Sequence, residues 1–152
     1  MIELLTNAKK KKITELLNEE YGIEKLRHLF IQTGKGKIRI FSGSLSKEEI
    51  NELAKNVHID TIGARLCNIE NDEIRLNFDI LNIPELKSQI NKNIIKITNE
   101  QVQKWLKGDN IEMVTDLGGK YIIVQNKGDF IGVARNNKTF IQNYVPKERR
   151  VK

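Results

Sequence analysis

The spacing of apolar residues at the start of the chain predicts a helix followed by a β-hairpin. Residues 8–20 carry apolar side chains at helical spacing, namely Ile13, Leu16 and Leu17. HLFIQ (28–32) and KIRIF (37–41) then flank TGKGK, in which Gly34 and Gly36 supply the turn. Four consecutive lysines precede the apolar residues of the helix, and acidic residues follow them, which is typical of a charge-paired, solvated helix start.

A second helix is predicted after Ser46. Ser46 and Glu49 have the spacing of a capping box, in which the two side chains bond the free amides of a helix start. One apolar face follows at helical spacing, formed by Ile50, Leu53, Ala54 and Val57.

Two runs with alternating apolar and polar residues come next, on either side of the turn ENDE. The apolar positions are Ile62, Ala64 and Leu66 in the first run, and Ile74, Leu76, Phe78 and Ile80 in the second. This period of two predicts an antiparallel pair with one buried face. The first 80 or so residues therefore have the order α-β-β-α-β-β, a sheet covered on one face by helices.

A junction with a shift in composition follows at LNIPELKSQIN, where Pro84 suits the first turn of a short helix. IIKI (94–97) then predicts a strand, and Thr98 with Gln101 forms a second capping box. The helix behind this box has an apolar stripe and a glycine at its left-handed end: Val102, Trp105, Leu106 and Gly108. Three short strands are predicted after it, KYIIVQ, DFIGVA and KTFIQ.

These elements predict an α+β fold in two domains. Residues 1–91 form an antiparallel sheet with helices on one face, and residues 92–152 form a small, rolled or barrel-like sheet. No apolar run approaches the ~20 residues that a membrane span needs, so we expect no membrane partner. The charges near the start are in the wrong order for a secretory signal, and a single cysteine suits a reducing interior. We therefore expect a cytoplasmic protein.

The net charge of +6 comes entirely from the second domain. Residues 1–91 hold 14 basic and 14 acidic residues, whereas residues 92–152 hold 12 basic and 6 acidic ones. From Arg135 onward, six bases accompany one acid, Glu148. Such an asymmetry favours a polyanionic partner, most often a nucleic acid, although a merely soluble basic surface has the same composition.

No residue pattern predicts catalysis. His28, His58 and Cys67 have no recurrent metal-ligand spacing, so no metal is expected. GKGK lacks the spacing of a phosphate-binding loop, and no glycine fingerprint for a dinucleotide is present, so no cofactor is expected. Cys67 is more typical of a small buried or half-buried residue than of a nucleophile. We therefore predict that the protein is not an enzyme.

Three stretches carry a resemblance to a known family: WLKGDNIEM, KYIIVQNKGDFIGVAR and NYVPKERRV. Together they resemble the PUA domain, a small RNA-binding pseudo-barrel, over residues 92–152. Leu106 with Gly108 and the segment from Gly132 to Arg135 carry the likeness, and Ala134 stands where the family usually has a second glycine. The tail is similar to the end of archaeal PUA proteins related to the Nol/Nop/Fmu RNA methyltransferase group. In those methyltransferases a proline or threonine precedes the nucleophilic cysteine, whereas Leu66 precedes Cys67 here.

The resemblance implies an RNA-binding protein of ribosome assembly or RNA modification. Its implied partner is rRNA or tRNA, with an RNA methyltransferase or ribosome assembly factor as a further candidate partner. The residues expected to bind RNA combine basic side chains, two glycines and one aromatic ring: Lys104, Lys107, Gly108, Gly132, Arg135, Lys138, Tyr144, Lys147, Arg149 and Arg150. Tyr144 either stacks on a base or anchors the tail. The tail itself is either docked or a disordered end. The alternative function is that of a protein-interaction adaptor for an RNA methyltransferase or assembly factor.

Overall fold

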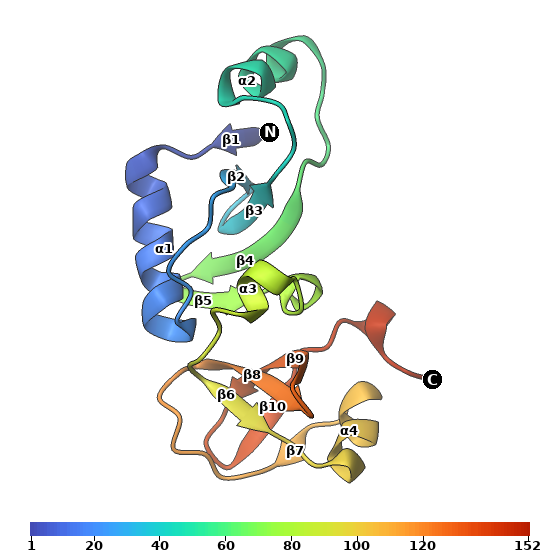
Figure 1. Cartoon of the computed structure of the whole chain (residues 1–152). Helices are drawn as coiled ribbons and strands as arrows, with labels where there is room; N and C mark the ends of the chain where they lie inside the picture. The colour runs from blue at the N-terminus through green and yellow to red at the C-terminus, as the bar shows by residue number, and fades with distance from the viewer.

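The structure is a computed structural model that describes residues 1–152 as two five-stranded sheets, one above the other in Figure 1. The chain leaves sheet A after β5 and enters sheet B at β6. The elements follow the chain in this order: β1 (Ile2–Leu4), α1 (Asn7–Tyr21), β2 (Leu29–Thr33), β3 (Lys37–Phe41), α2 (Lys47–Asn56), β4 (Ala64–Glu70), β5 (Glu73–Leu76), the 3₁₀ turn η1 (Phe78–Ile80), α3 (Pro84–Lys87), β6 (Ile94–Lys96), α4 (Asn99–Leu106), β7 (Ile111–Glu112), β8 (Tyr121–Asn126), β9 (Asp129–Asn136), β10 (Phe140–Asn143) and the 3₁₀ turn η2 (Lys147–Arg149).

Sheet A is an antiparallel meander in which the strands keep their sequence order, β1-β2-β3-β4-β5. The predicted hairpin is β2–β3, and the predicted alternating pair is β4–β5. The second strand of that pair was predicted too long, because it ends at Leu76 and Phe78–Ile80 form η1. The side chain of Asn77 accepts a hydrogen bond from the amide of Asp79 (3.0 Å), which turns the chain while Ile80 still reaches the core.

A bulge in β4 changes the predicted alternation there. Ile38 lies opposite Cys67, but Arg39 lies opposite Arg65, so Leu66 is the extra residue. Leu66 and Cys67 are consequently both fully buried, and the predicted apolar position Ala64 is exposed.

Helix α1 covers sheet A with Ile13, Leu17 and Tyr21, and it ends at Gly22 in the left-handed conformation (φ 82°). Helix α2 lies at the β1 end of the sheet (Figure 1). Its capping box forms as predicted, but Ile50 is its only buried residue. The predicted apolar face is therefore wrong beyond Ile50, since Leu53, Ala54 and Val57 are exposed. The later turns of α2 line an open hollow beside Met1 and Ile2 and do not enter the core.

Sheet B curls into a half-barrel with the order β6-β8-β9-β10-β7. β6 runs parallel to β8, and the remaining pairs are antiparallel. Trp105 from α4 is fully buried inside this curl, as predicted, with residues such as Val124 and Ile141. None of the helices in the chain has the length and apolar character that a membrane span requires.

The two sheets share one hydrophobic core. Ile123, Phe130 and Val133 from sheet B belong to the same cluster as the core residues of sheet A. Polar contacts reinforce this junction, since the side chain of Asn82 donates to the carbonyl of Phe130 (2.8 Å) and accepts from its amide (3.1 Å). The division at residue 91 stays a prediction, but the two parts are packed together and not linked flexibly.

Candidate nucleic-acid interface

The basic tail is docked on the end of α4. Asn143, the one buried polar residue, donates to the carbonyls of Trp105 (2.7 Å) and Asp109 (3.0 Å) and accepts from the amide of Val145 (2.8 Å). Farther along, the amide of Val151 donates to the carbonyl of Leu106 (2.9 Å). The bond from Val151 satisfies a carbonyl that the helix end otherwise leaves free, and Asn143 adds a second donor to the Trp105 carbonyl, which also accepts from the amide of Gly108 (3.0 Å).

Gly108 and Arg150 lie in direct contact. The Arg150 Nε donates to the Val145 carbonyl (3.1 Å), and a Cβ on Gly108 would lie 2.7 Å from that same nitrogen. Only glycine allows the arginine to cross the helix end at this distance, and Gly108 also has a positive φ of 103°. The sequence pattern Leu106–Gly108 therefore positions an arginine.

Four predicted residues belong to the two segments that meet here, and we name them the α4–tail cluster: Lys104, Lys107, Lys147 and Arg150. Lys104 lies one helical turn before Lys107, and Lys147 and Arg150 are joined within the η2 turn by a backbone bond (3.3 Å). The three lysines are exposed and Arg150 is half-buried. No acidic side chain forms an ion pair with any of the four, so their charges are available to an anion.

Other predicted residues lie elsewhere. Gly132 is buried, with Trp105 beside it: a Cβ on Gly132 would lie 2.7 Å from the indole nitrogen. Lys138 lies in the β9–β10 turn, at the opposite end of that hairpin from the tail. Arg149 forms an ion pair with Asp79 (2.9 Å), which connects the tail to the first domain.

Arg135 and Tyr144 belong to the face of sheet B that is turned toward sheet A. Arg135 lies directly opposite Tyr121, and the ring of Tyr144 is 5.7 Å from the Tyr121 ring. The guanidinium of Arg75, from β5, covers the Tyr144 ring at 5.0 Å and the Tyr121 ring at 5.7 Å. Tyr144 therefore lies between the two sheets, with one side of its ring packed against Tyr121.

Sequence reasoning missed Arg75, although the signal was present. Basic side chains occupy polar positions of the alternating strands of the first domain, for example Lys37 and Arg39 around the buried Ile38. The alternation shows that they share a face, but only the packing of the two domains shows that this face reaches Tyr144.

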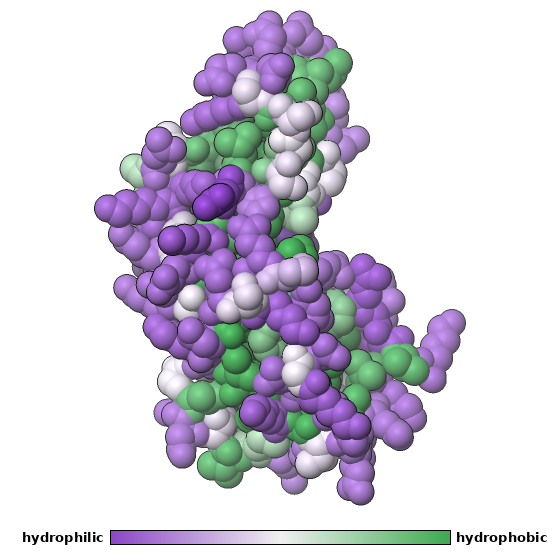
Figure 2. All heavy atoms as spheres, viewed as in Figure 1, coloured by the Kyte–Doolittle hydropathy of each residue, from purple (hydrophilic) through white to green (hydrophobic).

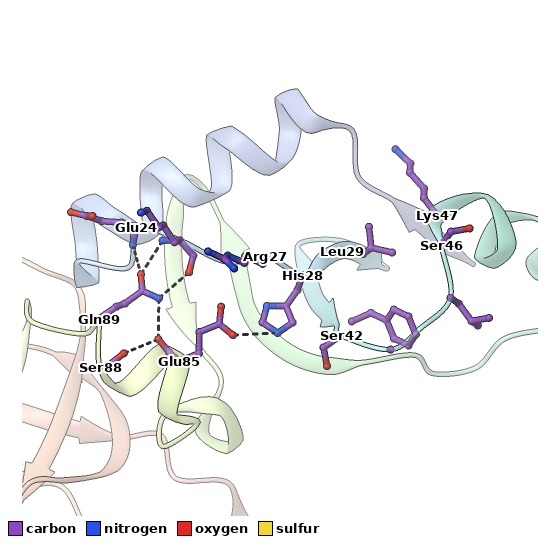
Figure 3. A pocket seen from close by; sticks show the side chains of 14 residues that line it. Glu24, Arg27, His28, Leu29, Ser42, Ser46, Lys47, Glu85, Ser88 and Gln89 are labelled. Atoms are coloured by element: carbon purple, nitrogen blue, oxygen red, sulfur yellow. Dashed lines mark hydrogen bonds and ion pairs between the residues drawn. The ribbon is translucent and has the colours of Figure 1, made fainter.

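A separate polar hollow of about 890 Å³ lies between α3 and the loops around β2 and β3 (Figure 3). Gln89 holds one wall together, because its Oε1 accepts from the amides of Glu24 and Lys25, both at 2.9 Å. His28 points toward Glu85, with 3.5 Å from Nε2 to the carboxylate, and its Nδ1 is buried without a hydrogen-bond partner. The contacts of Gln89 therefore stabilise the segment that leads from α3 into sheet B.

The residues considered for chemistry lie apart. Cys67 is fully buried, as predicted, and burial raises the pKa of its thiol well above the ordinary range. A thiolate is therefore disfavoured there. His58 is exposed and pairs with Asp60 (3.0 Å). No group of three His, Cys, Asp or Glu side chains is placed to hold a metal ion.

Comparison with known families agrees with this geometry. Residues 92–151, which contain sheet B, α4 and the docked tail, match the family model described as the methyltransferase RsmF PUA domain. The comparison with curated proteins finds no match.

Proposed function

We propose that this chain, whose residues 92–151 form a PUA domain related to the Nol/Nop/Fmu methyltransferase group, is a non-catalytic RNA-binding protein that acts in ribosome biogenesis or in the modification of rRNA or tRNA. A PUA domain supports RNA binding in general. The choice of rRNA or tRNA and the absence of catalysis are part of the proposal.

The α4–tail cluster is the observation that carries the proposal. Its bases come from two segments that the tail's docking brings together, and none of them is neutralised by an acid. Lysine and arginine side chains arranged in this way neutralise phosphates and release condensed counterions. Arg150 can also present a fork of donors to a phosphate or a guanine edge.

Fluorescence anisotropy with a labelled structured RNA, measured across a salt series, tests the proposal. We expect Lys107→Glu with Lys147→Glu to weaken binding at least tenfold and to flatten the dependence of log affinity on log salt, by about 0.7–0.9 for each phosphate that is no longer neutralised. Lys11→Glu with Lys12→Glu changes the same charge at exposed positions of α1 and is the matched control. Equal losses of affinity in both double variants would show nonspecific attraction only.

The alternative function is an adaptor that works beside an rRNA methyltransferase, and the RsmF relationship of residues 92–151 favours it. An adaptor with incidental RNA contact would keep its cellular function in Lys107→Glu with Lys147→Glu, whereas the RNA-binding protein would lose it. Point variants are preferable to deletion of residues 92–152, because deletion would expose the core that sheet A shares with Phe130 and Val133.

A further inference from the structure

Sheet A presents a pair of arginines on the face opposite its core. Arg39 in β3 and Arg65 in β4 lie directly opposite each other, and both are half-buried. Like charges in this position destabilise a sheet unless something neutralises them. Neither arginine forms an ion pair with an acid, and the one hydrogen bond of the pair runs from Arg39 Nε to the carbonyl of Ile62 (3.2 Å). An anion beside them would relieve the repulsion.

The next row of the same face holds an unsatisfied amide. Asn68 in β4 lies opposite Arg75 in β5. The Asn68 Oδ1 is buried without a hydrogen-bond partner. A buried polar atom without a partner is unfavourable, so a native structure that contains one calls for an explanation. Asn68 adjoins Arg75 and the Tyr144 ring, and a ligand at that place would supply the missing bond.

These residues line a continuous depression between the two sheets, which we name the junction groove. Two hollows of about 190 and 630 Å³ make it up, and they share Arg65 and Asn77. Tyr144 and Arg149 line it from the second domain. The outline of the molecule narrows on this side, where the two lobes meet near the tail (Figure 2). Asp79 is the one acid of the groove, and Arg149 neutralises it.

We propose that the junction groove binds an unpaired stretch of RNA, so that a strand held by the α4–tail cluster continues onto sheet A. This inference rests on the proposed RNA-binding function. Arg39 and Arg65 contact phosphates through their forked donors. A base stacks on the platform of Tyr144 and Arg75, and Asn68 bonds a base edge or a ribose hydroxyl. An unpaired strand fits because a base inside a duplex is already stacked and cannot reach an aromatic platform.

Anisotropy with a labelled single-stranded oligouridine and the full chain tests the groove. Arg39→Gln with Arg65→Gln is expected to reduce the salt slope by about 0.7 for each phosphate that the arginines no longer neutralise. The same double variant is expected to leave the thermal midpoint unchanged or higher, because like charges are removed. Lys11→Gln with Lys12→Gln on α1 is the control and is expected to keep the wild-type slope.

Two further substitutions separate binding from folding. Tyr144→Phe keeps the ring and is expected to bind like wild type, whereas Tyr144→Ala is expected to lose about tenfold in affinity. Asn68→Ala removes an unsatisfied buried atom, so we expect an unchanged or raised thermal midpoint together with weaker RNA binding. A residue with a purely structural role would not show this combination.

The outcomes distinguish the two proposals. If Lys107→Glu with Lys147→Glu weakens binding but none of the groove variants does, the groove is not a site and the RNA-binding function stands. If the wild-type chain binds neither oligouridine nor a structured RNA, both proposals are wrong.

Discussion

The hydroxyl of Tyr21, at the end of α1, lies 3.2 Å from the carbonyl oxygen of Tyr121 in β8, 100 residues further along the chain. The same hydroxyl donates to the carbonyl of Ile74 in β5 at 2.8 Å. One buried polar group thus connects the first helix, sheet A and sheet B. The relative placement of the two sheets, on which the junction groove depends, rests on this contact and on the shared core around it.

Tyr21→Phe should therefore destabilise the whole chain. The substitution keeps the ring but removes the hydroxyl that donates to the buried Ile74 carbonyl, at a cost of about 1–3 kcal/mol. Urea denaturation followed by circular dichroism and by the fluorescence of Trp105 measures this destabilisation. We expect both signals to shift together, since the two sheets share a core. Separate transitions would show that the domains unfold independently.

The capped helices were the elements that the sequence predicted best. Both capping boxes form, because a cap depends on residues only three positions apart. β1 and β7 were missed, since three and two residues are too few to show a period, and these strands exist only because a neighbouring strand pairs with them. The bulge at Leu66 depends on packing and not on local pattern.

The arrangement of the candidate site could be predicted only in part, for the same physical reason. The basic tail and the end of α4 could be linked through their compositions, but Lys138 could not be placed, because the pairing of β9 with β10 decides which end of the hairpin meets the tail. The partners of Tyr144 come from another domain. Contacts between residues so far apart in the sequence depend on how the two sheets pack, and the spacing of residues along the chain does not reveal this packing.

Asn143→Ala should loosen the tail and weaken RNA binding together. The Asn143 side chain donates to the carbonyls of Trp105 and Asp109 and accepts from the amide of Val145, so its removal takes one partner from each of these main-chain groups, although the Trp105 carbonyl keeps the amide of Gly108. We expect the free energy of unfolding to fall by about 1–3 kcal/mol. We also expect the affinity for structured RNA to weaken, because Arg150 is no longer held in place. Asn137→Ala is the control, since its side chain makes only a bond of 3.4 Å to Gln142. Unchanged RNA affinity in a destabilised Asn143→Ala protein would mean that the docked tail does not contribute to binding.

The Ser46–Glu49 capping box should make stability depend on pH in the acid range. Hydrogen bonds from the main chain and side chain of Ser46 hold the pKa of Glu49 below its usual value. A carboxylate whose pKa is lowered on folding stabilises the native state above its unfolded pKa, and this contribution disappears as the pH falls through the folded pKa.

Glu49→Gln isolates this effect, because a glutamine fills the same role in the Thr98–Gln101 box without a charge. We expect the difference in unfolding free energy between wild type and Glu49→Gln to shrink steadily as the pH falls from about 6 to about 3, through the usual range of a glutamate. A difference that stays constant across this range would mean that the carboxylate charge contributes nothing to the cap.

Cys67 should report the opening of the core. It is the chain's only cysteine, it is fully buried, and burial raises the pKa of its thiol, so an aromatic disulfide reagent can reach a reactive thiolate only when the structure opens. Native protein at pH 8 should therefore react far more slowly than unfolded protein, in which one thiol per chain reacts at once.

When opening and closing are fast, the labelling rate follows the population of the open state. Tyr21→Phe should then label about tenfold faster for each 1.4 kcal/mol that it destabilises the chain. Rapid labelling of the native protein would contradict the burial of Cys67, and with it the bulged register of β3 and β4 that sets Arg39 opposite Arg65 in the groove.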